Sequence, residues 1–264
     1  LSGERLLITT GSIRAGLEDS QMFLGSKEAC EVHHIPHQIM TGPEVNRRFP
    51  GYRLSEDTMA VYQADGGFLL SERCIVNHLA AALDLGAEVH GREKALDWEP
   101  TAEGVRVSTD RGDYTASNLV VCSGAWTSKI VPELAKSTVV ERQVLAWFQP
   151  RRPELFRPDT FPVFGVLVEE GRFYGFPTYG VPGFKIGRTH HLDHQVDPDL
   201  LDREIHPEDE AILRNFTSQY FPEADGPALA LKTCMFTNSP DEHFILDTLP
   251  DFPQVSVAAG FSGH

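Results

Sequence analysis

The stretch that most constrains this chain lies near its end, where LKTCMFTNSPDEHFILD covers residues 231–247 and VSVAAGFSGH covers residues 255–264. The first run places Cys234 inside an apolar segment of the kind that forms a strand. The second is a β-branched strand that ends in small residues and glycines, which permit a tight turn. Together they predict two strands, a candidate reactive thiol and a glycine-rich turn.

A cysteine is a nucleophile only as its thiolate, so a reactive Cys234 requires a partly exposed thiol near cationic groups. Lys232 and His243 are close to it in sequence. The alternative is a buried core thiol, which is the common role of a cysteine in an apolar strand. The other cysteines are Cys30, Cys74 and Cys122. Their wide spacing, with no CxxC pair, predicts neither a disulfide framework nor a zinc site.

Charge and composition narrow the class of protein. The formal net charge is −15, which argues against nucleic acid and anionic membrane surfaces as partners. With 264 residues and 41% hydrophobic content the chain can bury a substantial core. No apolar run reaches the roughly 18 residues of a membrane span, and the start lacks a signal-peptide layout. We therefore expect a soluble, cytoplasmic protein.

The rest of the sequence alternates between short strands and helices. Helices are predicted over residues 20–33, over residues 75–87 with Ser71 as a plausible cap and Gly86 as a stop, and over residues 206–221. Strands are predicted over residues 6–12, 87–92, 104–110 and 114–126, with a hairpin turn at 110–113.

The run RFYGFPTYGVPGFKIGRTHH, residues 172–191, is the candidate for substrate chemistry. Two strand-like runs flank a turn at Pro182 and Gly183, and they carry Tyr174, Phe176 and Lys185, with His190 on the returning strand. Aromatic walls with few charges suit a small amine, because they strip water from it. The alternative is an ordinary hairpin with a lysine and a histidine on its surface.

The run NLVVCSGAW, residues 118–126, is a strand that ends in Ser-Gly-Ala. Nothing larger than a methyl group follows the strand, so a ligand can approach the backbone near Gly124. The alternative is a tight turn with Trp126 as core filler.

The combination of KTCMFT, PDEHF and AAGFSGH resembles the covalent-flavin segment of the monomeric sarcosine oxidase and N-methyl amino acid (N-methyltryptophan) oxidase family, in the D-amino acid oxidase-like superfamily. The resemblance extends over essentially all 264 residues. It implies FAD joined through the sulfur of Cys234 to the flavin 8α-methyl. It also implies oxidation of a secondary amine, sarcosine or another N-methyl amino acid, to an imine, with O2 reduced to hydrogen peroxide by a monomeric enzyme.

The resemblance also implies site residues. Lys185 matches a lysine near flavin N5 that promotes oxygen reduction, and Tyr174 and Phe176 match aromatic positions beside the substrate. His190 matches an active-site histidine but lies one residue further from the lysine than in some relatives, so His191 stays an alternative. The implied cofactor-binding residues are Cys234, Ala95, Gly124, Gly260, Gly263 and His264.

One position departs from the family pattern. Phe236 stands where relatives have a tyrosine that contacts substrate, so the implied pocket lacks one hydroxyl and sarcosine itself is a less certain substrate.

The implied fold class is α/β plus α+β, with an FAD-binding Rossmann-like domain interleaved with a mixed-sheet substrate domain. The expected substrate-domain portions are residues 1–62 and 139–240, and the expected FAD-binding portions are residues 63–138 and 241–264. No G-x-G-x-x-G motif occurs. We therefore expect an internal fragment that lacks the glycine-rich motif and the C-terminal part, and that is inactive without them.

Three alternative functions share these features. An FAD-dependent amine or imino-acid dehydrogenase would pass electrons to a carrier instead of O2. A fructosyl amino acid oxidase would differ in pocket shape. A flavin-binding assembly subunit would have no catalytic activity, and its Cys234 would carry no flavin.

Overall fold

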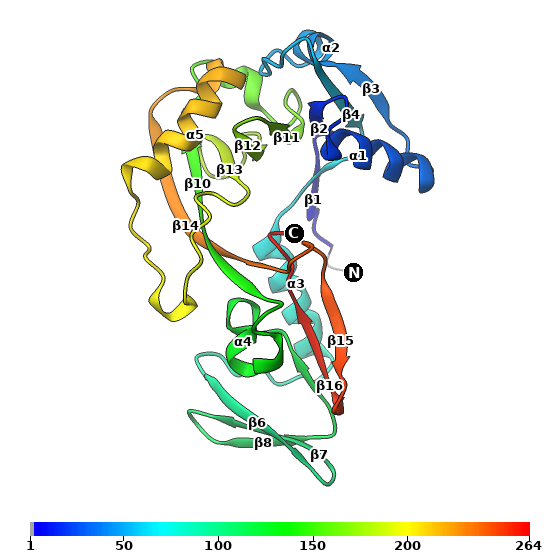
Figure 1. Cartoon of the computed structure of the whole chain (residues 1–264), viewed down its shortest axis with the longest axis vertical. Coiled ribbons are helices and arrows are strands. Elements are labelled where there is room, and N and C mark those ends of the chain that lie inside the picture. The colour runs from blue at the N-terminus through cyan, green and yellow to red at the C-terminus, as the bar shows by residue number, and fades with distance from the viewer. Residues whose placement is uncertain (1–2) are drawn as a thin grey trace. The chain divides into compact units, whose positions relative to one another are not determined.

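The computed structural model describes residues 3–264, which form two compact units (Figure 1). Unit 1 consists of residues up to Ala82, Gln143–Leu192 and Arg203–Cys234. Unit 2 consists of Leu83–Arg142, Asp193–Asp202 and Met235–His264. Each unit is therefore assembled from three separate stretches of the chain.

Unit 1 is built on an eight-stranded mixed sheet with the strand order β14-β10-β13-β12-β11-β2-β4-β3. Its strands are β2 (Ser12–Leu17), β3 (Gln38–Thr41), β4 (Thr58–Gln63), β10 (Val139–Phe148), β11 (Val163–Val168), β12 (Gly171–Phe176), β13 (Phe184–Arg188) and β14 (Ala228–Asn238). The pair β2 and β11 is parallel, whereas β10, β13, β12 and β11 pair antiparallel in succession. The ends of β10 and β14 continue into unit 2.

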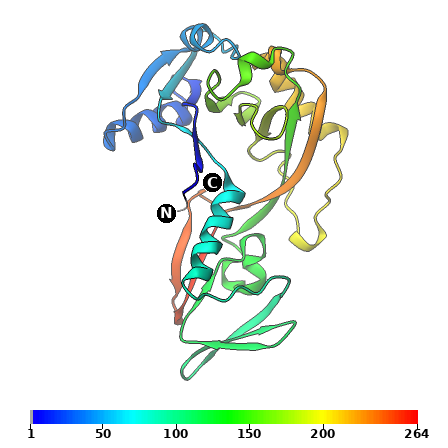
Figure 2. The ribbon, with the colours of Figure 1, turned by 180° about the vertical axis from the view of Figure 1, so that it is seen from behind.

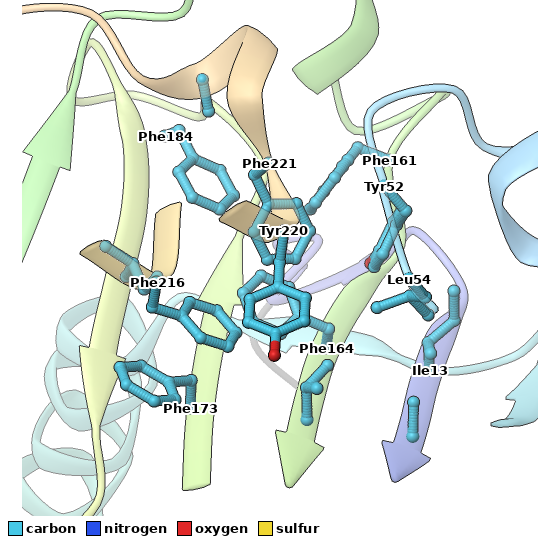
Figure 3. Packing of buried hydrophobic residues seen from close by; sticks show 14 of the residues in the cluster. Ile13, Tyr52, Leu54, Phe161, Phe164, Phe173, Phe184, Phe216, Tyr220 and Phe221 are labelled. Carbon is cyan, nitrogen blue, oxygen red and sulfur yellow. The ribbon is translucent and has the colours of Figure 1, made fainter. Parts of the chain in front are cut away.

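One face of this sheet carries the main hydrophobic core, which is rich in phenylalanine (Figure 3). Helix α5 (Pro207–Tyr220) contributes Phe216, whose ring stacks on Phe173 of β12 with centroids 3.8 Å apart. Phe164 and Phe221 stack beside them at 4.6 Å. Burying a phenylalanine side chain stabilises a fold by about 1.5–3 kcal/mol. This aromatic layer therefore fixes the strands that carry the opposite face.

Helix α1 (Gln21–Val32) packs on the opposite face, at β4, through Phe23 and Cys30 against Val61. The hydroxyl of Ser20 caps the helix by accepting a hydrogen bond from the backbone N–H of Phe23 at 3.3 Å. Unit 1 also contains α2 (Gly42–Arg48) and the strand pair β1 (Leu7–Thr9) and β5 (Gly67–Leu69).

Helix α3 (Ser71–Asp84) has no buried residue within the described part of the chain. Its apolar side chains Ile75, Val76, Leu79 and Leu83 are all exposed.

Unit 2 contains two small sheets. In the first, β15 (Ile245–Leu249) pairs antiparallel with β16 (Phe252–Ala259), which pairs parallel with β9 (Leu119–Val121). The second is the antiparallel ribbon β6 (Ala95–Thr101), β7 (Gly104–Thr109) and β8 (Asp113–Ala116), coloured cyan to green in Figure 2. Short helices η1 (Gly124–Trp126) and α4 (Thr127–Ile130) follow β9. Valines from β7, β9 and β16 form most of the core of unit 2.

The predicted fold class, with mixed sheets and both helix and strand, is confirmed. Helices at 20–33 and 206–221 are observed as α1 and α5, and the turn at 110–113 joins β7 to β8. The strand predicted over 87–92 is wrong, because these residues form coil and turn. Gly86 and Arg92 both have positive φ, +88° and +58°, which interrupts an extended backbone at each end.

The predicted assignment of the chain to FAD-binding and substrate portions stays a prediction. Among residues 3–264, no helix is both long enough and apolar enough to span a bilayer.

Candidate active site

The open face of the unit 1 sheet, opposite its aromatic core, carries most of the predicted catalytic residues. Along β13, Phe184 and Ile186 are fully buried in the core, so Lys185 between them points to the other face. The same alternation on β12 buries Phe173 and turns Tyr174 and Phe176 to that face. Phe176 pairs directly with Lys185 in the strand register. The structure therefore brings these three predicted residues together.

Lys185 lies between two aromatic rings. Its Nζ is 5.1 Å from the ring centroid of Phe176 and 5.3 Å from that of Trp147 on β10. No carboxylate of residues 3–264 forms an ion pair with it. Burial lowers the pKa of Lys185, and the charges of Cys234 and Glu72 partly oppose this effect. A half-buried cation held by π faces keeps its charge available to a ligand.

Cys234 lies on β14, the edge strand of the sheet, and is half-buried. Burial raises the pKa of its thiol, and the positive charge of Lys185 opposes this shift. Lys185 is therefore the cation that acts on the thiol in the fold. The sequence neighbours Lys232 and His243 are exposed and do not contribute to this shift.

Tyr174 lies flat across the neighbouring strand, where Gly187 is its partner in the register. A Cβ atom added to Gly187 would lie 2.6 Å from Cζ and from the phenol oxygen of Tyr174. The absence of a side chain at Gly187 thus makes room for the phenol. Burial, with a smaller contribution from Cys234, raises the pKa of Tyr174, so the phenol stays protonated.

The predicted histidine lies outside the strand that carries Lys185. β13 ends at Arg188, and His190 follows it with a positive φ of +54°, so its predicted position on the returning strand is wrong. The alternative, His191, is fully buried, and its Nε2 lies 3.1 Å from Oδ1 of Asp209 at the start of α5. This burial removes His191 from contact with a substrate, and the role of His190 stays a prediction.

In unit 2, two of the predicted cofactor-binding glycines lie at one edge of a sheet. β9 and β16 run parallel, with Val121 paired to Val257, so their carboxyl ends face the same way. Gly124 follows β9 with φ +54°, and Gly260 follows β16 with φ +63°. No atom lies within 4 Å of a Cβ position at Gly124. Ligands of open α/β sheets bind outside the carboxyl ends of parallel strands.

The remaining predicted cofactor residues are placed differently. Gly263 has φ +85°, and a Cβ there would lie 2.6 Å from Cζ of Phe236, so only glycine fits this turn. His264 is exposed, and its Nδ1 lies 3.1 Å from the carbonyl oxygen of Phe261. Ala95 begins β6, in the other small sheet, so the parallel strand ends give it no support as a flavin contact.

Two residues of the open face were missed from the sequence, Trp147 and Gly187, and so was Glu72 on helix α3, whose charge acts on Lys185. The alternation in QVLAW, residues 143–147, was a usable signal, since Val144 and Ala146 are buried and Trp147 faces the other way. The contribution of Glu72 depends on the position of α3 and has no local sequence signal.

Comparison with known proteins decides the family. A family model described as FAD dependent oxidoreductase (DAO) matches residues 6–264. The chain belongs to this FAD-dependent oxidoreductase family. It is 37% identical over 265 residues to the monomeric sarcosine oxidase of Bacillus sp. (strain NS-129), covering 98% of this chain and 68% of the relative. It is 35% identical over 268 residues to that of Streptomyces avermitilis, covering 100% of this chain and 70% of the relative.

Solved structures of the same fold agree with this assignment. NikD, an unusual amino acid oxidase essential for nikkomycin biosynthesis, superimposes with a TM-score of 0.80 at 22% identity, covering 98% of this chain and 70% of NikD. L-proline dehydrogenase from P. horikoshii superimposes with a TM-score of 0.79 at 18% identity, covering 98% of this chain and 68% of the dehydrogenase. At these identities the likeness concerns the fold alone.

The described residues fit an FAD cofactor. The thiol of Cys234 is accessible on a face lined by aromatic rings and a lysine. In unit 2, the open space at Gly124 beside the end of a parallel strand suits a nucleotide.

Proposed function

We propose that this chain carries FAD attached through Cys234 and oxidises the secondary amine of an N-methyl amino acid, with O2 as acceptor and hydrogen peroxide as product. The observation that carries the proposal is the convergence of Cys234, Lys185 and Tyr174 on one sheet face. The names of the relatives at 35–37% identity, monomeric sarcosine oxidases, support the substrate class. They also support a monomer, and the four free cysteines suit a reducing compartment such as the cytoplasm.

When bound, FAD supplies the two-electron acceptor for the amine. Tyr174 and Phe176 exclude water around the amine and favour its neutral form, which is the oxidisable one. Lys185 supplies a fixed positive charge in a water-poor setting, where it stabilises negative charge that develops on reduced oxygen. In unit 1, His190 adds a polar group near the strand end. In unit 2, taken by itself, the proposed cofactor-binding residues are Gly124, Gly260, Gly263 and His264.

Attachment of the cofactor requires the thiolate of Cys234. Cys234 would hold the cofactor through a carbon–sulfur bond to the ring methyl group. Forming this bond would remove one hydrogen from the methyl group and one from the thiol, and O2 would take up the two electrons and two protons as hydrogen peroxide. The charge of Lys185 favours the thiolate, and burial disfavours it.

Acid precipitation of the full-length protein tests the attachment. We expect a yellow pellet from wild type and release of FAD into the supernatant from Cys234→Ser. Release of all flavin from wild type would show that the attachment is wrong. Peroxide formation on addition of N-methyl amino acids tests the reaction, and dye reduction without oxygen consumption would indicate a dehydrogenase instead.

A further inference from the structure

A row of directly paired residues crosses the open face of the unit 1 sheet. In strand order it runs Leu145, Gly187, Tyr174, Gly165 and Arg14. Residues that pair directly across neighbouring strands have their side chains on the same face. Arg14 therefore shares the face of Tyr174, whereas its neighbours along β2, Ile13 and Ala15, are fully buried in the core.

The glycine between these two side chains determines where the guanidinium lies. A Cβ atom at Gly165 would overlap Nη1 of Arg14 and would lie 3.3 Å from its Cδ and Cζ. The guanidinium therefore extends from β2 over β11, toward Tyr174 on β12. This arrangement matches that at Gly187, where the missing side chain makes room for Tyr174 itself.

Among residues 3–264, the Arg14 guanidinium has no anionic partner. Within the described part of the chain, no residue forms an ion pair or hydrogen bond with it. Its pKa is lowered, first by loss of hydration and second by the charge of Arg172, which lies two residues before Tyr174 on the same face. Arg14 nevertheless remains exposed to solvent. A crowded but accessible arginine beside a second arginine is suited to receive an anion from outside.

Positively charged side chains gather on the open face that carries Arg14, although the chain as a whole is acidic. The chain as a whole carries a net charge of −15, yet the open face collects Arg14, Arg172 and Lys185. Glu72 acts on Lys185 and is not among the charges that shift Arg14.

We propose that Arg14 is a specificity-determining residue that binds a second carboxylate of the substrate, at the end of an acidic side chain. The inference rests on the proposed function for its amine chemistry. The α-carboxylate carbon of an amino acid is two bonds from the amine nitrogen, so this carboxylate lies close to the reacting amine. The guanidinium over β11 lies two strand spacings, about 10 Å, from the strand of Lys185, so it meets a group further along a longer substrate.

Kinetics with matched substrates tests the assignment in the FAD-loaded full-length enzyme. N-methyl-L-glutamate and N-methyl-L-glutamine differ in the charge of one terminal group. We expect wild type to prefer the acid in kcat/KM by about 10-fold or more. Arg14→Met should raise KM for the acid by about 10- to 100-fold, with kcat and the values for the amide nearly unchanged. The exposed Arg53→Met serves as control and should leave the preference intact.

A second variant separates position from charge. Gly165→Ala keeps Arg14 but displaces its guanidinium, and it should also abolish the preference for the acid. Equal losses with both substrates in Arg14→Met, or a wild type without preference, would overturn the proposal.

Calorimetry distinguishes failure of the Arg14 proposal from failure of the proposed function. Glutarate should bind wild type at least about tenfold more tightly than its monoamide, and Arg14→Met should remove the difference. Arg14-dependent binding of glutarate without turnover of any N-methyl amino acid would refute the proposed function and leave the role of Arg14 standing. Turnover without Arg14-dependent binding would refute the role of Arg14 alone.

Discussion

At the scale of single residues, Lys185 is the centre of the open face. Its Nζ lies close to two aromatic rings, and its charge acts on the thiol of Cys234. In the proposed function, Lys185 influences both the thiol to which the cofactor is attached and the negative charge that develops on oxygen, so it links attachment to oxygen chemistry. Its two roles can be separated by experiment, because they belong to different steps.

Replacing Lys185 with methionine tests the oxygen role. Lys185→Met should slow reoxidation of reduced flavin by about 100-fold or more, since each factor of ten corresponds to ~1.4 kcal/mol of lost stabilisation. Anaerobic reduction by substrate should change by less than about tenfold. Stopped-flow measurement of the two half-reactions gives both rates, and the exposed Lys232→Met on β14 is the matched control. Slow reduction with fast reoxidation would assign Lys185 to substrate binding instead.

The raised pKa of Cys234 predicts how the rate of the proposed flavin attachment depends on pH. A raised pKa leaves less thiolate at neutral pH than an ordinary cysteine has, so we expect deprotonation of Cys234 to limit the rate of the proposed flavin attachment. Mixing apoprotein from riboflavin-starved cells with FAD should give an attachment rate that rises about tenfold per pH unit. The plateau should come above the usual thiol pKa of about 8.5. Acid-quenched samples taken over time measure the rate, and a rate independent of pH would contradict this account.

At the scale of elements, helix α5 is fixed to the sheet by a buried polar pair. Oδ1 of Asp209 lies 3.1 Å from Nε2 of His191, and its Oδ2 accepts a hydrogen bond from the backbone N–H of His206 at 2.9 Å. The carboxylate thus satisfies both the helix N-terminus and the segment after β13. Because both side chains are fully buried, loss of one would remove a buried polar contact from the other.

We expect Asp209→Ala to lower the free energy of unfolding by about 3 kcal/mol or more. Glu208→Ala, an exposed residue in the same helical turn, should change it by less than about 0.5 kcal/mol. Urea unfolding followed by circular dichroism compares the two variants. A loss below about 1 kcal/mol for Asp209→Ala would mean that the pair contributes little to stability.

The elements predictable from the sequence were those with a strong local pattern. Pro207 and the acids that follow it marked α5, and the alternating aromatic residues of 172–176 marked β12. The full burial of His191 was not predictable, because it depends on α5, whose Asp209 lies 18 residues further along the chain. The position of the Arg14 guanidinium over Gly165 was equally unpredictable from the sequence, since these two residues are 151 positions apart.

At the scale of the whole molecule, the two units differ in the size of their cores. Unit 1 has an extensive aromatic core, whereas the core of unit 2 consists mostly of valines from a few short strands. Local opening is easier where fewer apolar contacts must be broken. Helix α3 is the extreme case, because none of its described residues is buried.

Hydrogen exchange of this 264-residue chain should follow that order. Amides of α5, β12 and β13 should exchange slowest, those of β6–β8 faster, and those of α3 at least about 100-fold faster than those of α5. Mass spectrometry of peptic fragments resolves these segments. Equal protection of α3 and α5 would show that α3 is covered in solution, by a second copy or by another part of the chain.

The alternation along β12 has a consequence for how this enzyme can change over time. Arg172, Tyr174 and Phe176 lie on the open face of the sheet, and the residues between them face the core. If this face binds substrate as proposed, a library that varies only every second residue of β12 would sample new substrate preferences with little cost to folding. Point mutations on the open side of β12 can change chemistry, while the residues on its other side keep the core packed and the fold unchanged.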